Sequence, residues 1–412
     1  MKSYCKNVVV NDVKLAEQAI HNCFTGKWKR RDVRNMLSGY CDYTPKQILD
    51  ILKAGKKHLL GQAVHNLALE IVGRINNRDL KLPPTRTKII QDGSQKKQRT
   101  IEVEAYEHQI FDHIAVLCME ELFRKKVGVY QSASIKKRGQ IYSKKHIAKW
   151  LRTDPEGTRV AVKCDAKKYY QNVSIPTLIR LLERDINKNK PLLWLVTQLL
   201  LQMKQGLNIG SYLSQFMANY YMSYLYHYAE NELFVTRRSR RNGNVRVRLI
   251  RRILIYMDDI LLLGANRKYI LMAYRKLTEY ARDFLKITFK KSWRFFYVDY
   301  EDKYGVRHGC HIDMVGFKMY RTFTVLRDHI FLKARRAFRK VQKYRRRGWA
   351  ITAQMAHRVM SYNGWFKNAD LYKWCQKHGT DGIVEYCKEF ISNHDKKRAA
   401  KPRKEIPELM AA

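Results

Sequence analysis

The sequence is poor in acidic residues. Of its 412 residues, 37 are Asp or Glu and 81 are Lys or Arg, which leaves a formal net charge of +44. A charge of this size opposes compaction by self-repulsion, so we expect an anionic partner that neutralises it. Nucleic acid is the first candidate, and an anionic membrane surface is the second.

Long apolar runs are also missing. No stretch reaches the roughly 18 apolar residues that a transmembrane helix needs. Residues 1–18 lack the apolar stretch and the small-residue cleavage site of a signal peptide. We therefore expect a cytoplasmic protein with no membrane partner, which leaves nucleic acid as the predicted polyanion.

Glycine, proline and closely spaced cysteines are scarce as well. The 20 Gly and 8 Pro are too few for a collagen-like or linker-like chain. No two of the 8 Cys lie two to four residues apart, which excludes a zinc ribbon and a CxxC redox pair. Hydrophobic residues make up 45% of the chain, enough for a large core, and the length predicts two or three structural units.

The apolar periodicity divides the chain into helical and extended segments. In the first half we expect helices over most of 1–80, a β-hairpin at 85–104 around the turn signal Asp92-Gly93-Ser94, and a helix at 105–125. We then expect a strand at 160–165, helices within 175–203 and 211–234, two strands within 245–264, an amphipathic helix at 266–286 and short strands to about 327. A very basic helix at 331–347, helices within 352–391 and a disordered end from His394 should follow.

The segment that most clearly predicts chemistry is Tyr256-Met257-Asp258-Asp259, which joins two apolar strands. Burying two adjacent carboxylates is costly, because like charges repel and desolvation adds to the cost. An isolated Asp-Asp pair is more often a solvated turn, but the apolar flanks and the large positive charge favour a metal site here. A divalent cation that prefers hard oxygen ligands, above all Mg²⁺, resolves the conflict.

A third carboxylate is needed to hold two ions. Asp165 qualifies, because it ends an apolar strand of the kind that lies beside a β-hairpin. Two metal ions held between Asp165, Asp258 and Asp259 can activate a 3′ hydroxyl and stabilise a leaving pyrophosphate. These three aspartates are therefore the predicted catalytic and metal-binding residues, with Mn²⁺ as the alternative to Mg²⁺.

YMDD between apolar strands resembles the catalytic hairpin of reverse transcriptases, and the family pattern can be followed from about residue 85 to 375. The segment KCDAKKYYQNVSI is similar to the strand that carries the first metal-binding aspartate of that family, here Asp165. The resemblance implies an RNA-directed DNA polymerase, a nucleotidyltransferase that copies template RNA into cDNA. It also implies an α+β right hand, with mixed fingers, a palm built on a small antiparallel sheet, and a helical thumb.

The resemblance also sets domain limits and nucleotide contacts. It implies fingers at 81–160, a palm at 161–327 and a thumb at 328–393, with an N-terminal helical extension at 1–80 and a disordered basic tail at 394–412. The residues implied to contact the incoming nucleotide are Lys97 and Arg99 of the fingers hairpin, Tyr170 as steric gate against a ribose 2′-OH, and Tyr256 and Met257 of the catalytic hairpin. Taken alone, Lys97 and Arg99 would be surface charges, and Tyr170 would suit core packing equally well.

One block departs from the common family pattern. Most reverse transcriptases carry Gln-Gly-x-x-x-Ser-Pro where this chain has Ile209-Gly210-Ser211-Tyr212-Leu213-Ser214-Gln215. This version is similar to that of diversity-generating retroelements, whose enzymes copy a template RNA with errors at adenines. A branched apolar side chain in place of an amide removes a hydrogen bond to the nucleotide, which is consistent with loose discrimination. The substrate-binding residues implied here are Ile209, Gly210, Ser214 and Gln215.

Basic residues after the catalytic hairpin are implied to act on the product and the primer. FLKITFKKSW matches the region whose Lys is proposed to protonate the leaving pyrophosphate; Lys290 is our candidate, and Lys291 is the alternative. Val315-Gly316-Phe317 resembles the primer grip. The basic helix would track a duplex backbone through Lys333, Arg335, Arg336, Arg339, Lys340, Lys343 and Arg345. A solvated charged face is the alternative, although helical like charges repel.

Residues 237–252 hold eight Arg around the hairpin-turn signal Asn242-Gly243. This run either binds template RNA or an accessory subunit, or is a solvated loop. The resemblance implies as partners a template RNA, an RNA/DNA hybrid, dNTPs and a small basic accessory protein oligomer. Two other functions stay open, namely a phage-defence reverse transcriptase of the abortive-infection or retron-like kind, and a non-catalytic RNA-binding chaperone of the intron type.

Overall fold

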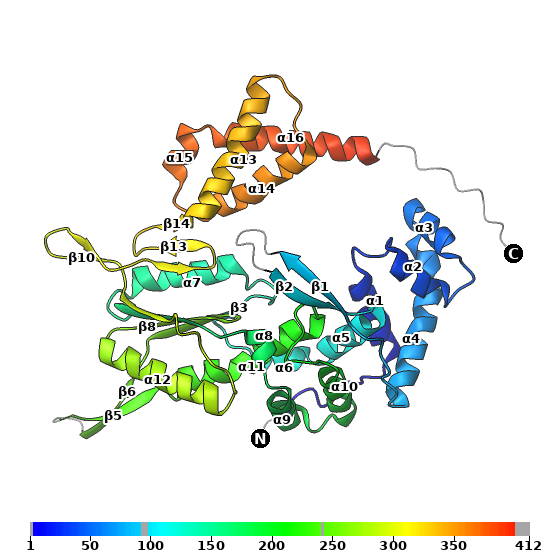
Figure 1. Cartoon of the computed structure of the whole chain (residues 1–412), viewed down its shortest axis with the longest axis horizontal. Coiled ribbons are helices and arrows are strands. Elements are labelled where there is room, and N and C mark those ends of the chain that lie inside the picture. The colour runs from blue at the N-terminus through cyan, green and yellow to red at the C-terminus, as the bar shows by residue number, and fades with distance from the viewer. Residues whose placement is uncertain (1–2, 92–97, 240–242, 400–412) are drawn as a thin grey trace.

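The computed structural model describes residues 3–91, 98–239 and 243–399, which form a mixed α+β fold (Figure 1). The helices are α1 (Val13–Phe24), α2 (Arg31–Ser38), α3 (Pro45–Ala54), a 3₁₀ helix (Lys57–Leu60), α4 (Gly61–Asn76), α5 (Tyr106–Cys118), α6 (Glu120–Lys126), α7 (Gln140–Thr153), α8 (Tyr169–Asn172), α9 (Ile175–Ile186), α10 (Lys190–Leu201), α11 (Tyr212–Asn231), α12 (Arg267–Asp283), α13 (Asp328–Arg346), α14 (Ala353–Phe366), α15 (Tyr372–Lys377) and α16 (Thr380–Ala399).

The strands are short and fall into several small sheets. They are β1 (Arg86–Gln91), β2 (Gln98–Val103), β3 (Gln131–Ser132), β4 (Val160–Asp165), β5 (Phe234–Ser239), β6 (Gly243–Arg248), β7 (Arg252–Tyr256), β8 (Asp259–Gly264), β9 (Arg294–Tyr297), β10 (Tyr300–Glu301), β11 (Arg307–His308), β12 (Ile312–Met314), β13 (Phe317–Met319) and β14 (Thr324–Leu326). The largest sheet has five strands in the order β3-β7-β8-β4-β9, and β12, β13 and β14 form a three-stranded sheet.

The central sheet is covered on both faces, which explains why its strands read as continuous apolar runs. Successive side chains point to opposite faces of a strand. In β8, Ile260 and Leu262 belong to one hydrophobic core, whereas Leu261 and Leu263 belong to the other. The first core also contains residues of α1–α5 and α9–α12, and the second contains residues of α7, β12–β14, α13, α14 and α16. The sheet therefore lies between two helical layers.

Figure 1 shows how these layers are arranged. Helices α13, α14, α15 and α16 gather beside β13 and β14 at the top of the view, while α2, α3 and α4 lie along its right-hand edge. The hairpin β1–β2 lies between the central sheet and these N-terminal helices. Among the described residues, no helix is long and apolar enough to cross a membrane.

Most predicted elements are confirmed in place. The hairpin strands β1 and β2 pair antiparallel from Arg86↔Val103 to Gln91↔Gln98, although the turn signal Asp92-Gly93-Ser94 lies outside the described residues. The amphipathic helix is α12, whose Asn266 side chain accepts hydrogen bonds from the Lys268 and Tyr269 N–H groups at its N-terminus. The division of the chain into fingers, palm and thumb stays a prediction.

Two predictions are wrong in part. Residues 243–248 do not continue into β7; they form β6, which pairs with β5 from Ser239↔Gly243 to Phe234↔Arg248, while Asn242 lies outside the described residues. Arg246 lies over the Phe234 ring, 4.0 Å from its centroid, so this hairpin has contacts of its own. The chain end is also not disordered from His394, because α16 continues to Ala399; Lys, Arg and Ala favour helix where a buried segment has already nucleated it.

Candidate active site

Asp165 and Asp259 meet at one corner of the central sheet. Asp165 is the last residue of β4 and Asp259 the first of β8, and the two are direct partners in the antiparallel register. Directly opposed residues place their side chains on the same face. The next pair, Cys164 and Ile260, turns to the other face and is buried in the core. Both aspartates consequently line a single pocket of about 800 Å³.

The third carboxylate comes from the turn between β7 and β8. Tyr256 pairs with Asp259, so only Met257 and Asp258 form the turn. Met257 has φ 54°, a left-handed conformation that is uncommon outside glycine and costs free energy. The Asp258 carbonyl accepts a hydrogen bond of 3.0 Å from the Ala166 N–H, which ties the turn to the residue after Asp165. Two strands thus supply three aspartates at one place.

The electrostatics of this corner favour a cation. Burial, and next the charge of Asp165, raise the pKa of Asp258 to about 6. Burial also raises the pKa of Asp259, an effect that nearby Lys163 reduces. Carboxylates that share a poorly solvated site resist ionising together unless a positive charge offsets them. The donor set consists of carboxylate oxygens, which are the ligands that hard divalent cations take.

Lys290 is held against Asp165 by both its backbone and its side chain. Its Nζ lies 2.5 Å from Asp165 Oδ1, and its N–H donates to the Asp165 carbonyl at 2.8 Å. An isolated bridge between Ala166 and Phe289 keeps the two segments side by side. Lys291, the alternative in the sequence, is exposed and forms no ion pair with a described residue. Of the two lysines, it is therefore Lys290 whose side chain contacts a carboxylate of this corner.

Tyr170 lies beside the catalytic turn. Its hydroxyl donates to Met257 Sδ at 3.9 Å, and burial, followed by the charge of Asp258, raises its pKa to about 12. Its carbonyl accepts from the Leu207 N–H at 2.7 Å. A Cβ on Gly206 would lie 2.4 Å from that carbonyl oxygen, so Gly206 permits this close approach. The aromatic ring is thereby held next to the aspartates.

The block at 209–215 is anchored to the hairpin strand β2. The Ile209 carbonyl accepts from the Glu102 N–H at 3.0 Å, and a Cβ on Gly210, whose φ is 113°, would lie 2.9 Å from the Glu102 carbonyl oxygen. Ser214 is fully buried, with its hydroxyl 3.8 Å from Met203 Sδ, and Gln215 is half-buried. Of this block, Ile209, Gly210 and Gln215 reach the surface, whereas the Ser214 side chain packs inside.

Among the other predicted nucleotide contacts, Arg99 and Tyr256 lie within the described residues. Arg99 is exposed on β2 opposite Ile90 and is not among the residues that line the pocket. Lys97 lies outside the described residues. Tyr256 is half-buried and directly precedes the turn. The structure thus groups Tyr170, Tyr256 and Met257 with the aspartates and leaves Arg99 on the hairpin.

Helix α13 presents cations on one side and packs with the other. Its buried residues are Ala334, Phe338 and Val341. The exposed cations predicted to bind nucleic acid are Lys333, Arg336, Arg339, Lys340 and Lys343, and Arg335 is half-buried. Arg345 instead serves packing, because it donates to the Gly382 carbonyl at 3.2 Å and lies over the Tyr386 ring. Six of the seven basic residues named from the sequence are therefore exposed on this helix, and five of them remain when Arg345, which contacts α16, is set aside.

The turn between β12 and β13 is the predicted primer grip. Val315 has φ 50° and Gly316 φ 88°, so both turn residues are left-handed, which is rare for a β-branched residue. A Cβ on Gly316 would lie 2.6 Å from the Trp365 ring. The turn is consequently packed tightly against α14, and Phe317 is buried beside Trp365 at a centroid distance of 5.2 Å.

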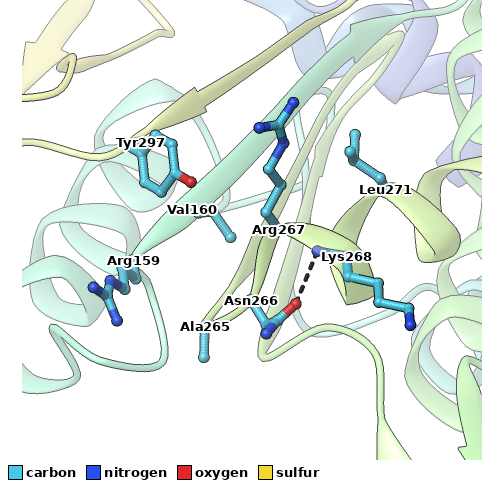
Figure 2. A pocket seen from close by; sticks show the side chains of 8 residues that line it. All are labelled: Arg159, Val160, Ala265, Asn266, Arg267, Lys268, Leu271 and Tyr297. Atoms are coloured by element: carbon cyan, nitrogen blue, oxygen red, sulfur yellow. Dashed lines mark hydrogen bonds between the residues drawn. The ribbon is translucent and has the colours of Figure 1, made fainter.

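A second pocket lies at the other end of β4, where Val160 begins the strand (Figure 2). It has a volume of about 490 Å³, and none of the described residues that line it is a carboxylate. Figure 2 shows that its basic side chains, Arg159, Arg267 and Lys268, point in different directions and do not converge. Of these two pockets, only the one at the Asp165 end of the strand is therefore lined by carboxylates.

The sequence analysis missed a buried group of possible metal ligands. Glu104, His108 and Asp112 lie together at the start of α5, each buried. The four-residue spacing of His108 and Asp112 within the helix predicted at 105–125, with Glu104 just before it, is the signal that could have found them. Apolar residues dominate the same segment, so its helical pattern predicted core packing alone.

Comparison with known proteins yields no match, either to a family model or to a curated protein. The function is therefore argued from the geometry of the site and from the sequence motifs that form it.

Proposed function

We propose that this protein is an RNA-directed DNA polymerase, a reverse transcriptase, with its active site at the corner formed by Asp165, Asp258 and Asp259. The observation that carries the proposal is the direct cross-strand pairing of Asp165 with Asp259 beside the Met257–Asp258 turn. Sequence motifs far apart in the chain meet there in the order that the family resemblance implies. The net charge of +44 supports a polyanionic template and product.

The chemistry follows from the residues at this corner. The three carboxylates would hold two Mg²⁺ ions, with Mn²⁺ as the alternative. When bound, these ions activate the primer 3′ hydroxyl and neutralise charge on the leaving pyrophosphate. Lys290, held near Asp165, is positioned to donate a proton from its ammonium group to the departing pyrophosphate oxygen. Tyr170 would present its ring to the sugar and so disfavour a ribose 2′-OH.

The proposed architecture is a right hand. The hairpin β1–β2 and the helices next to it serve as fingers, the five-stranded sheet as palm, and α13–α16 as thumb. Exposed cations on α13 support backbone contact with a template–primer duplex. The tight turn at Val315-Gly316 supports a role for this segment near the primer end, between the palm and the thumb.

Within this class we propose the diversity-generating branch, because of the Ile209-Gly210 pair. Ile209 has no side-chain donor or acceptor to hold an incoming nucleotide, and its carbonyl is already used by Glu102. A site that fails to hydrogen-bond its substrate discriminates weakly against near-isosteric competitors. The expected product is cDNA with errors concentrated at template adenines.

The test is primer extension on an RNA template with Mg²⁺ and all four dNTPs. The double variant Asp258→Asn/Asp259→Asn should lose incorporation by about three orders of magnitude or more, because it removes charge needed to hold the ions. Asp283→Asn, at an exposed carboxylate on α12, is the matched control and should extend like the wild type. Equal extension by the wild type and the double variant would refute the polymerase assignment.

Sequencing the products tests the finer assignment separately. Misincorporation concentrated opposite template adenine supports the diversity-generating branch, whereas an equal error rate at all four bases removes it and leaves the polymerase intact. Tight RNA binding without any metal-dependent synthesis would instead point to the chaperone function.

A further inference from the structure

A second group of ligating side chains lies apart from the three aspartates. His108 and Asp112 are four residues apart and so share one face of the first turns of α5, and Glu104 lies just before this helix, in the segment that follows β2. Each offers one ligand atom, and the three atoms lie within 4.8 Å of one another. His108 Nε2 is 3.9 Å from Glu104 Oε1 and 3.9 Å from Asp112 Oδ1, which places the imidazole between the two carboxylates.

These groups are buried and short of partners. Glu104 is 5% exposed, His108 1% and Asp112 0%. Both carboxylate oxygens of Glu104, both ring nitrogens of His108 and Oδ1 of Asp112 make no hydrogen bond to a described residue. Buried polar groups in folded proteins nearly always have a partner. Five unpartnered atoms in three adjoining side chains, one from each of which lies within 4.8 Å of the others, indicate that a ligand binds between them.

The surrounding residues do not supply that partner. Asp112 Oδ2 accepts from Ser211 Oγ at 2.8 Å and from the Leu213 N–H at 3.0 Å, which leaves Oδ1 directed at the cluster. Ser211 and Asn208 lie close enough to lower the pKa of Glu104, yet neither meets hydrogen-bond geometry with its oxygens. The free atoms therefore converge on one another rather than on the rest of the core.

The charges of the cluster favour the binding of a cation. Two carboxyl groups, Glu104 and Asp112, are confined together away from water, and they resist ionising together unless a cation offsets their charge. The His108 ring is buried and neither of its nitrogens has a hydrogen-bond partner among the described residues, so one of them is available to a metal ion. A dication would neutralise the two carboxylates and use the free ring nitrogen at the same time.

We propose that Glu104, His108 and Asp112 bind one transition-metal ion of the Zn²⁺ class, as a structural site separate from the catalytic aspartates. The imidazole selects against Mg²⁺, whose ligands are oxygens, and suits Zn²⁺ and its neighbours in the first row. Three protein ligands leave a fourth tetrahedral position, which water or an oxygen of Asn208 or Ser211 can fill.

The position of the site indicates what the ion does. Glu104 follows β2, whose Glu102 N–H donates to the Ile209 carbonyl, and Asp112 bonds to Ser211 and Leu213 at the N-terminus of α11. An ion shared by Glu104 and Asp112 ties the base of the hairpin to the block at 209–215. It thereby fixes the spacing of two segments that come from distant parts of the sequence.

The experiment measures metal content and needs no polymerase activity. The full-length protein is stripped with a chelator, reloaded with Zn²⁺, passed over a desalting column and analysed for zinc per chain. We expect one tightly held ion in the wild type, and its loss in Glu104→Gln and in His108→Gln. Asp258→Asn/Asp259→Asn should keep the ion, which separates this site from the catalytic one. His227→Gln, at a half-buried histidine that bonds to the Lys126 carbonyl, is the matched control and should also keep it.

A second measurement covers variants that fail to fold. Co²⁺ loaded into the stripped wild-type protein should show the intense visible absorption of a four-coordinate site, and one equivalent of Zn²⁺ should abolish it. Absence of bound zinc in the wild type, a Co²⁺ spectrum identical to that of the ion in buffer, or full zinc retention by Glu104→Gln and His108→Gln would each overturn the proposal. If the wild type holds no zinc, or if its Co²⁺ spectrum is that of the ion in buffer, a proton shared by Glu104 and Asp112 takes the place of the metal.

Discussion

The Nζ atom of Lys290 lies 2.5 Å from Oδ1 of Asp165, and the N–H of the same lysine donates to the Asp165 carbonyl. The backbone hydrogen bond fixes the position of the lysine main chain, while its side chain, 44% exposed, is held by the ion pair and is accessible to a ligand in the pocket. An ammonium group held in this way stands next to the proposed metal site without occupying it. The contact is the basis of the first prediction.

Replacing Lys290 should slow chemistry rather than weaken nucleotide binding. We expect Lys290→Ala to lower kcat for nucleotide addition by about 10²–10⁴, the range that general acid catalysis contributes, with little change in KM. Lys291→Ala is the matched control, because this exposed neighbour forms no ion pair with a described residue, and it should stay near the wild-type rate. Single-turnover extension of a defined primer measures both. An equal loss in the two variants would contradict the role given to Lys290.

Removing the ring of Tyr170 should relax sugar selection. We expect Tyr170→Ala to lower the preference for dNTPs over rNTPs by roughly tenfold or more, because a clash with the 2′-OH disappears. Tyr170→Phe keeps the ring and loses only the hydroxyl contact to Met257, so it should retain the preference. Competing dNTP and rNTP incorporation is the measurement. If both variants select as strongly as the wild type, Tyr170 packs against the turn without contacting the sugar.

The stability of the metal-free protein should depend on pH through Asp258. Its folded pKa of about 6 lies above its ordinary value, so the folded state holds the proton more tightly than the unfolded chain does. The stabilisation that the protonated Asp258 carboxyl gives the folded state is complete below about pH 4 and is lost as the pH rises from about 4 through 6. Asp258→Asn has no such carboxyl and should not show this loss of stability, which in the wild type is on the order of 3 kcal/mol. Unfolding curves of both proteins in chelator, from about pH 4 to pH 7, give the slope of the unfolding free energy against pH for each protein.

The same comparison with added Mg²⁺ provides the control. Above pH 6 the ion should restore stability to the wild type and do little for Asp258→Asn, because it replaces the proton as the compensating charge. Parallel pH profiles for the two proteins in chelator would show that Asp258 does not experience the buried, like-charged environment described here.

Gly210 should tolerate no side chain. Its φ of 113° is unfavourable for other residues, and an added Cβ would lie 2.9 Å from the Glu102 carbonyl oxygen. We expect Gly210→Ala to lower the free energy of unfolding by about 1–3 kcal/mol. Gly73→Ala, inside α4 with open space around it, should instead raise that free energy by about 0.5–1 kcal/mol. Urea unfolding of the two variants distinguishes these outcomes, and a neutral Gly210→Ala would argue against the close approach of β2.

Local elements could be predicted from the sequence where a single local feature, such as an apolar run or an apolar stripe, defines them. The strands β4 and β8 stand out because both of their faces are buried, so that nearly every residue is apolar. Helix α12 stands out through its apolar stripe and its Asn266 cap. Residues 243–248 were predicted less well, because two hairpins follow each other and alternation alone does not say which partner a strand takes.

The order of residues was enough to predict that Asp258 and Asp259 lie where two apolar strands join, that Asp165 ends another such strand, and that the chain is strongly cationic. Long-range packing was needed to set Asp165 opposite Asp259, to bring Lys290 rather than Lys291 to Asp165, and to bring Glu104, His108 and Asp112 together in the core. The reason is physical. Periodicity and turn chemistry act over a few residues, whereas strand register and buried polar contacts depend on which distant segments pack together.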